Sequence, residues 1–388
     1  MPIKNRLAEM HPEITAWRRD LHENPELMYD THRTAAVVAA KLREFGCDEV
    51  VEGIGRTGVV GVIRGRSDRR GHVVGLRADM DALPILEATG LPHASKVPGR
   101  MHACGHDGHT AMLLGAAKYL AETRNFDGSV ALIFQPAEEG GAGALAMVED
   151  GLIDRFRIRE AYGMHNSPGL PVGAFSIKPG PFYAATDEFA IHVTGRGGHA
   201  AKPHTTVDTT VVASHLVVAL QSIASRNADP VAALVVSVTS FRTESDAYNV
   251  IPERVELRGT VRTFEKELRQ LGETRLREIA QGVAATFGAA VRIDWKEGYP
   301  AMVNSDAETA YAAEVARRVS GSIDPQAPPI MGGEDFAYIL EAVPGAYIQI
   351  GNGDTADVHH PAYDFNDEAI PLGASYWAEL VETRMPAE

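Results

Sequence analysis

The segment VALIFQPAEEGG, residues Val130–Gly141, joins an apolar run to two adjacent carboxylates. Val130–Phe134 has the length and unbroken hydrophobicity of a buried strand. Glu138 and Glu139 follow it after a short turn. Because ligands bind at the carboxyl ends of strands in α/β sheets, one carboxylate can bind a metal while the other faces the open cavity as a base. An acidic pair at the start of the next helix is the alternative reading of this segment.

Similar apolar runs and helical patterns surround this segment. Their alternation predicts a mixed α/β sheet with helices on both faces. Gly46 is placed to cap the end of the second helix. The expected strands are Gly58–Ile63, His72–Leu76 and Val130–Phe134, and the expected helices are Ile14–Leu21, Thr34–Phe45 and Thr110–Leu120.

The pattern changes after about Ala185. Residues 188–193 alternate between apolar and polar side chains, as a half-exposed strand does. The order βαββαβ that follows is typical of a small ferredoxin-like domain. We therefore expect an α/β domain of residues 1–185 plus 297–388, with an inserted lid-like α+β domain at 186–296. The expected elements of the insert are strands at 188–193, 234–241, 255–263 and 290–295, and helices at 207–224 and 265–287.

Composition narrows the class of protein. The 388 residues exceed what one core normally organises, so two domains are expected. The net charge of −15 repels phosphate backbones, which argues against a nucleic-acid partner. No long apolar window and no signal-peptide pattern occur, so no membrane association is expected. Cys47 and Cys104 are too few for a disulfide framework, and the expected location is the cytoplasm.

The densest group of chemically active side chains is MHACGHDGH, residues Met101–His109. In an extended segment, Cys104 and His106 would project to the same side, where a thiolate and an imidazole form half of a transition-metal site. The helix that follows would favour the thiolate form of the cysteine. A polar loop with one buried cysteine is the alternative.

Three further segments contain histidines. His165 follows an apolar run, and His359 and His360 precede Pro361 near the C-terminus. Taken singly, such histidines are usually hydrogen-bonded structural residues. His199 lies in the glycine-rich segment GRGGHAA (195–201), where an imidazole can stabilise a developing oxyanion. A bare glycine-rich turn is the alternative.

Together these segments resemble the aminoacylase and carboxypeptidase class of co-catalytic metallopeptidases, in particular the amidohydrolase branch that includes hippurate hydrolase and the IAA-amino acid hydrolases. The resemblance covers nearly the whole chain. It rests on seven segments in order: RADMDALP (77–84), MHACGHDGH (101–109), QPAEEGG (135–141), GHA (198–200), NVIP (249–252), GGEDF (332–336) and HHP (359–361).

The resemblance implies that residues 1–185 plus 297–388 form a catalytic domain of the zinc-peptidase type and that residues 186–296 form a lid and dimerisation domain. It also implies a role for each matching position. Glu138 matches the general base, and His199 matches a lid histidine that stabilises the oxyanion, often in the neighbouring subunit's site of a dimer. Asn249 and Arg262 match positions linked to the substrate carboxylate. Two metal ions would be bound by Cys104, His106, Glu139, His165 and His359, with His360 not excluded as the last ligand.

One departure from the wider class concerns Asp79-Met80-Asp81, where many members have a His-x-Asp motif. Cys104 and His106 are expected to take over as ligands, while Asp79 and Asp81 support the ligands through hydrogen bonds. A thiolate combined with imidazoles and carboxylates is compatible with two divalent ions of zinc, manganese, nickel or cobalt.

The expected activity is metal-dependent hydrolysis of the amide bond of N-acyl amino acids, either hippurate-like or N-acetylated. A dipeptidase or carboxypeptidase on the same scaffold is one alternative, and a non-catalytic metal- or ligand-binding homologue is the other. The absence of a Pro-Cys-x-x-Cys motif after His-x-Glu argues against a zinc deaminase. The absence of a Gly-x-Ser-x-Gly elbow argues against a serine hydrolase.

Overall fold

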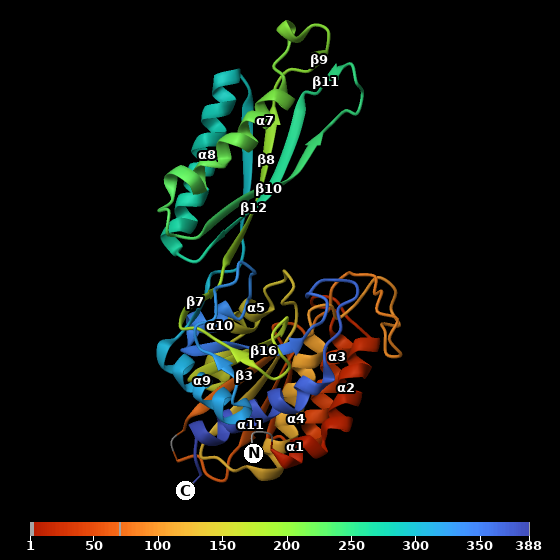
Figure 1. The fold of residues 1–388 in the computed structure, drawn as a ribbon, viewed down its shortest axis with the longest axis vertical. Helices are drawn as coiled ribbons and strands as arrows, with labels where there is room; N and C mark the ends of the chain where they lie inside the picture. The colour runs from red at the N-terminus through yellow and green to blue at the C-terminus, as the bar shows by residue number, and fades with distance from the viewer. Residues whose placement is uncertain (1–3, 70, 388) are drawn as a thin grey trace. The chain divides into compact units, whose positions relative to one another are not determined.

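The computed structural model describes residues 4–69 and 71–387 of the chain (Figure 1). These residues form two compact units. Unit 1 contains the chain up to Gly180, Val303–Pro328 and the part from Asp335 onward, and unit 2 contains Pro181–Met302 and Pro329–Glu334. The sequence pattern places the borders of the insert at 186 and 296, whereas the contacts place them at 181 and 302 and add a short second segment.

Unit 1 is built on a mixed sheet, which has eight strands among the described residues. β1, β2 and β4 pair antiparallel, whereas β4, β3, β5 and β16 run parallel to one another. The carboxyl ends of these four parallel strands therefore meet at one edge. In sheet order the strands are β1 (Glu49–Ile54), β2 (Gly58–Arg64), β4 (Ser129–Gln135), β3 (Val73–Asp79), β5 (Glu160–Pro168), β16 (Gly345–Gly353), β6 (Phe175–Ser176) and β15 (Ile323–Asp324).

Helices cover both faces of this sheet. Odd and even positions of β2 point to opposite faces of the sheet and meet different helices. A Cβ at Gly61 would lie 2.9 Å from Leu42 of α3 (His32–Glu44), and a Cβ at Gly58 would lie 2.8 Å from Met147 of α5 (Gly143–Glu149). β3 and β4 are buried along their whole length, as strands covered on both sides must be. The Leu42 face carries α1 (Asn5–Glu9), α2 (His11–Glu23), α3 (His32–Glu44), α4 (His106–Thr123), α9 (Asp306–Ser320) and α11 (Ile370–Arg384), and the Met147 face carries α5 (Gly143–Glu149), α6 (Leu152–Phe156) and α10 (Ala337–Ala342) (Figure 1).

The elements expected in this part of the chain are confirmed, with shifted ends. Gly46, with a φ of +80°, ends α3 as expected. The main correction concerns α4, which begins at His106 rather than at Thr110. His106 and His109 therefore lie on the first turns of a helix and not in an extended segment.

Unit 2 has the βαββαβ order with an antiparallel sheet, β10-β12-β8-β13. Burial alternates along β8, because only one face of the sheet is covered by helices. Leu216 of α7 and Leu276 of α8 pack on that face. The elements are β8 (Ala185–Thr194), β9 (Gly198–His199), a short helix at Pro203–Thr205, α7 (Thr209–Leu220) and a helical turn at Ile223–Asn227, then β10 (Leu234–Thr243), β11 (Val250–Ile251), β12 (Arg254–Thr263), α8 (Lys266–Phe287) and β13 (Ala290–Glu297).

The chain passes between the two units at β7 (Gly180–Tyr183) and β14 (Met302–Asn304), and a short helix at Asp367–Ala369 precedes α11. Within residues 4–69 and 71–387, no helix is both long and apolar enough to cross a membrane.

Candidate metal centre and active site

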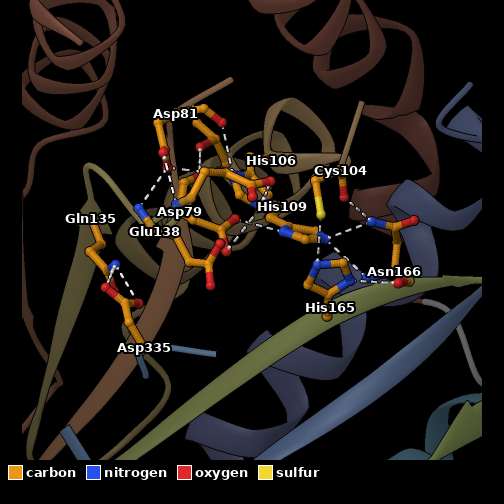
Figure 2. Close-up of polar contacts among 12 residues, drawn as sticks. Asp79, Asp81, Cys104, His106, His109, Gln135, Glu138, His165, Asn166 and Asp335 are labelled. Carbon is orange, nitrogen blue, oxygen red and sulfur yellow. Dashed lines mark hydrogen bonds and ion pairs between the residues drawn. The ribbon is translucent and has the colours of Figure 1, made fainter. Parts of the chain in front are cut away.

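The candidate site lies at the carboxyl edge of the parallel strands of unit 1. Asp79 is the last residue of β3 and is paired in register with Gln135, the last residue of β4. Glu138 and Glu139 follow Gln135 after the two residues Pro136 and Ala137, and His165 lies near the end of β5. These three strands thus bring together side chains that are far apart in the sequence (Figure 2).

The turn that carries Glu138 and Glu139 is tightly constrained. The carboxylate of Asp81 accepts hydrogen bonds from both of their backbone N–H groups, at 2.9 and 3.1 Å. Ala137 and Ala142, each with a φ of +54°, bracket the turn in a conformation that is costly for residues other than glycine. α5 starts only at Gly143, so neither glutamate lies in the first turn of the next helix, and the helix-capping interpretation is wrong.

Cys104 and His106 meet although they are not in an extended strand. Gly105, with a φ of +87°, precedes the first residue of α4 and turns the chain between them. The Cys104 thiol lies 3.3 Å from Nε2 of His165. One sulfur and two imidazole nitrogens, from Cys104, His106 and His165, lie within 4.8 Å of one another.

Hydrogen bonds to the backbone set the orientation of these two imidazoles. Nδ1–H of His106 donates to the carbonyl oxygen of Asp81 at 2.8 Å, and Nδ1–H of His165 donates to that of Asn166 at 2.6 Å. We assign the protons from this pattern. When neutral, each ring keeps a lone pair on Nε2, the arrangement that metal-binding histidines have in other proteins.

A second group shares the cysteine. Cys104, Glu139 and His359 each place one donor atom within 4.8 Å of the others. Nε2 of His359 lies 3.3 Å from Oε1 of Glu139. The loop of His359 is held close by its own N–H, which donates to the carbonyl of Ala103 at 2.7 Å.

His359 is the better placed of the two adjacent histidines. Its φ of +66° is unusual for a residue other than glycine and aims the side chain at Glu139. By contrast, Nδ1 of His360 accepts the backbone N–H of Ala362 at 3.0 Å, and His360 is absent from every group of three donor atoms found in the described residues.

The donor atoms fit two divalent ions. Nε2 of His106 and Oε1 of Glu139 are buried without a hydrogen-bond partner in the described part of the chain. Leaving a buried polar atom unpaired costs about 1–3 kcal/mol, so each of these atoms is suited to a ligand of another kind. The mixture of sulfur, nitrogen and oxygen donors is that of a transition-metal site.

The electrostatics of the site also favour a cation. Burial raises the pKa of the Cys104 thiol well above its ordinary value, and the charges of Glu139 and Glu138 raise it further. Without a metal ion, burial and these carboxylates therefore favour the thiol form of Cys104, and the expected contribution of the start of α4 stays a prediction. Burial lowers the pKa of His106, but Asp79 and Asp81 outweigh this effect and raise it to about 10. A divalent ion would reverse both shifts, because it stabilises the thiolate and displaces the imidazole proton.

Asp79, which is expected to support the ligands, is held by a network whose other members have no function assigned from the sequence. Its Oδ2 accepts Nη1 of Arg77 at 2.7 Å, and its Oδ1 accepts Nδ1–H of His109 at 2.7 Å. Arg77 also donates to Gln135 at 2.8 Å and to Asp335 at 3.1 Å. All of these side chains are buried. Arg77 and Asp79 are two positions apart in β3, so their side chains point to the same face of the sheet. This spacing is the sequence feature that relates them.

His199, Asn249 and Arg262 belong to unit 2. His199 in β9 pairs with Val250 of β11, and the N–H of Ala200 donates to the carbonyl of Asn249 at 2.9 Å, so His199 and Asn249 are neighbours. Arg262 is eight residues from Arg254, the first residue of β12, which corresponds to roughly 26 Å along an extended strand. Within unit 2, the structure brings His199 and Asn249 together and places Arg262 at the other end of the sheet.

These features define a class of protein. A mixed α/β unit presents two overlapping groups of metal donors at its strand ends, with a further buried carboxylate, Glu138, beside them. This is the plan of a hydrolase with two neighbouring metal ions.

The comparisons with known proteins identify the family. The family model described as peptidase family M20/M25/M40 matches residues 75–383, and the chain belongs to this family. It is 43% identical to hippurate hydrolase of Campylobacter jejuni over 377 residues, covering 96% of this chain and 97% of that protein. It is 41% identical to N-acetylcysteine deacetylase of Bacillus subtilis, covering 95% and 96% of the two chains.

A solved structure resembles the whole chain. The YxeP protein of Bacillus subtilis, described as a dinuclear metal-binding peptidase of the M20 family, superimposes with a TM-score of 0.84. It is 38% identical to this chain, with 97% of this chain and 99% of that one covered. The expected family, fold class and metal-dependent hydrolase activity are thereby confirmed.

Proposed function

We propose that this protein hydrolyses the amide bond of N-acyl amino acids, releasing a carboxylic acid and a free amino acid. The names of its relatives, hippurate hydrolase and N-acetylcysteine deacetylase, support this substrate class. The observation that carries the proposal is the position of Glu138, buried in one group with His106 and Glu139 at the edge of the donor cluster.

The proposed ligands are Cys104, His106, Glu139, His165 and His359. Cys104 belongs to both groups of donor atoms and would therefore be available to hold either ion. When bound, the two ions supply Lewis acidity that polarises the scissile carbonyl and lowers the pKa of a water molecule. The choice among zinc, manganese, nickel and cobalt stays open, because this donor set suits all four.

Glu138 is proposed to act as the general base. Its side chain is buried, and its backbone is fixed by Asp81, so the carboxylate has a defined direction. In the reaction Glu138 takes a proton from the attacking water and later gives it to the nitrogen of the leaving amino acid. Asp81 keeps Glu138 and Glu139 in their separate roles because it holds both N–H groups at once.

The roles of the unit 2 residues stay predictions. His199 is proposed to stabilise the tetrahedral oxyanion, and Asn249 and Arg262 to bind the substrate carboxylate. Because Asn249 precedes β11 and Arg262 lies near the end of β12, the two residues of one subunit are too far apart to bind the same carboxylate together.

We also propose a homodimer formed through unit 2. Val211 and Val218 on α7 and Phe241 on β10 are exposed, and Val218 is 73% exposed. β10 is an edge strand of its sheet in the described chain. Exposed apolar side chains beside an unpaired strand edge are typical of a surface that another chain covers. A cytoplasmic location stays a prediction from composition.

A substrate panel tests the proposed function. Metal-stripped protein is reconstituted with Zn²⁺, Mn²⁺, Ni²⁺ or Co²⁺ and assayed with N-benzoylglycine, several N-acetyl amino acids and a free dipeptide of matched size. We expect turnover of the N-acyl compounds only after a metal is restored. Preference for the free dipeptide would instead favour the dipeptidase alternative, and no turnover of any amide would favour a binding protein.

A further inference from the structure

Asn166 occupies the centre of a buried hydrogen-bond network beside the donor cluster. We infer that Asn166 is a positioning residue that orients Cys104 and His165 for metal binding. This inference rests on the proposed function, because it takes these two residues to be ligands. It concerns a residue that touches neither substrate nor metal.

Every polar group of Asn166 has a partner. Its side-chain Nδ2 donates to the carbonyl oxygen of Cys104 at 2.6 Å, and its Oδ1 accepts the hydroxyl of Tyr363 at 2.7 Å. Its backbone N–H donates to Nε2 of His109 at 2.9 Å, with Nδ2 at 3.1 Å from the same atom. Its backbone carbonyl accepts Nδ1–H of His165 at 2.6 Å. Figure 2 shows the contacts of Asn166 with Cys104, His109 and His165.

These hydrogen bonds act on two proposed ligands, His165 and Cys104. The carbonyl of Asn166 fixes the ring orientation of His165 and leaves Nε2 free to face the Cys104 sulfur at 3.3 Å. The Asn166 side chain holds the backbone of Cys104 itself. One residue of β5 therefore aligns an imidazole and a thiol that are 61 positions apart in the chain.

Close packing leaves Asn166 little freedom. A Cβ at Gly105 would lie 2.3 Å from Nδ2 of Asn166 and 2.5 Å from the hydroxyl of Tyr363, so only glycine fits there. Asn166 is 2% exposed and Tyr363 is fully buried. The requirement for glycine between Cys104 and His106 is thus explained by the amide and the phenol that pack against it.

The network also connects Asn166 to the opposite side of the cluster. His109 receives the N–H of Asn166 at Nε2 and donates Nδ1–H to Asp79, which in turn is held by Arg77. Both nitrogens of His109 are used in this way, so His109 is not available as a ligand. It joins Asn166 of β5 to Asp79 of β3.

The experiment compares two buried asparagines in unit 1. Asn304 is also buried and makes the same kinds of bonds: its Nδ2 donates to the carbonyls of Lys178 and Tyr347, and its Oδ1 accepts the N–H of Tyr347. None of these partners is a proposed ligand. Asn166→Leu and Asn304→Leu remove the same number of side-chain hydrogen bonds without adding charge.

The readout is Co²⁺ binding to the metal-stripped full-length variants, followed by chelator competition and by the thiolate-to-cobalt charge-transfer absorption. We expect Asn166→Leu to weaken Co²⁺ binding by about 10- to 100-fold, the usual effect of losing such a partner, and to lose absorption intensity. Asn304→Leu keeps both properties of the wild type. Tyr363→Phe, which removes only the bond to Oδ1, weakens binding in the same direction by a smaller factor.

Retention of wild-type affinity and absorption by both Asn166→Leu and Tyr363→Phe overturns the inference but leaves the ligand assignment intact. If Asn166→Leu does not fold, as judged by circular dichroism of the metal-free protein, Tyr363→Phe alone decides in the same way. Absence of the absorption band in the wild type overturns the assignment of Cys104 as a ligand, and the inference with it.

Discussion

Glu138 and Glu139 are neighbours in sequence with different surroundings. Glu139 lies within reach of His359 and has a buried oxygen without a hydrogen bond in the described residues, whereas Glu138 shares no group of three donor atoms with Cys104 or His359 in that part of the chain. Asp81 binds the two N–H groups with separate oxygens and so fixes the backbone that carries both side chains.

A pair of substitutions tests this division of roles. Glu138→Gln keeps the size and buried position of the side chain but cannot accept a proton. We expect turnover to fall by about 10²- to 10⁴-fold, the typical share of a general base, with metal content unchanged by elemental analysis. Glu139→Gln, the matched control, should lower the metal content instead. Substantial turnover by Glu138→Gln would remove Glu138 from the role of base.

The residues of the donor cluster could be predicted from the sequence, but the supporting network could not. His, Cys and paired carboxylates are residue types that commonly bind metal ions, so Cys104, His106 and Glu139 can be picked out from a single sequence. Asn166 and Arg77 have ordinary polar side chains whose function depends entirely on their partners. These partners are distant in the chain, and residue type alone does not reveal them.

Among the elements, α4 shows what a hydrophobic pattern does not predict, namely the residue at which a helix begins. Its apolar residues from Thr110 onward have clear helical spacing, but its first turn reads His106-Asp107-Gly108-His109, which contains poor helix formers. Hydrogen bonds to other elements stabilise this turn and offset its low helix propensity. One of them joins Nδ1 of His22 in α2 to Oδ2 of Asp107 at 2.8 Å. The helix therefore begins earlier than its composition indicates.

The bond between α2 and α4 predicts a dependence of stability on pH. Burial lowers the pKa of His22, but the carboxylates of Asp107 and Glu87 outweigh this and raise it to about 9, with Arg18 opposing them. Since the folded pKa lies above the unfolded value of 6.5, the stabilisation is complete below about pH 6.5 and is lost as the pH rises through about 9. A shift of this size corresponds to at most about 3 kcal/mol.

Urea unfolding of the metal-free protein at pH 6 and at pH 9.5 measures this loss. We expect the wild type to lose more stability across the interval than His22→Gln, whose amide can still bond to Asp107 but does not titrate. His93, whose ring lies 5.7 Å from that of His22, is present in both proteins and is thus controlled for. An equal pH dependence of the two proteins would contradict the role assigned to His22.

For the whole molecule, the change of pattern near Ala185 predicts an inserted unit, because period-2 alternation replaces fully buried strands there. The borders could not be read to the residue. β7 and β14, at which the chain changes unit, have four and three residues, too few to show a period. The second segment of unit 2, Pro329–Glu334, contains no helix or strand, so no hydrophobic period in the sequence indicates that it belongs to unit 2.

The proposed dimer and the proposed role of His199 can be tested together by complementation. Glu138→Gln and His199→Ala should each be nearly inactive alone. If His199 serves the site of the neighbouring subunit, a mixed dimer has one site with both residues intact and one site with neither. Random pairing of equal amounts then gives about one quarter of the wild-type activity per chain, since half of the dimers are mixed and half of their sites are active.

The two variants are co-expressed with different affinity tags, and the doubly tagged dimer is isolated and assayed. Activity well above that of either parent supports both proposals, and recovery should fail when Glu138→Gln and His199→Ala are combined in one chain and paired with itself. A mixed dimer as inactive as its parents would show that each His199 acts on its own subunit or not at all. A monomeric wild type in solution would refute the dimer directly.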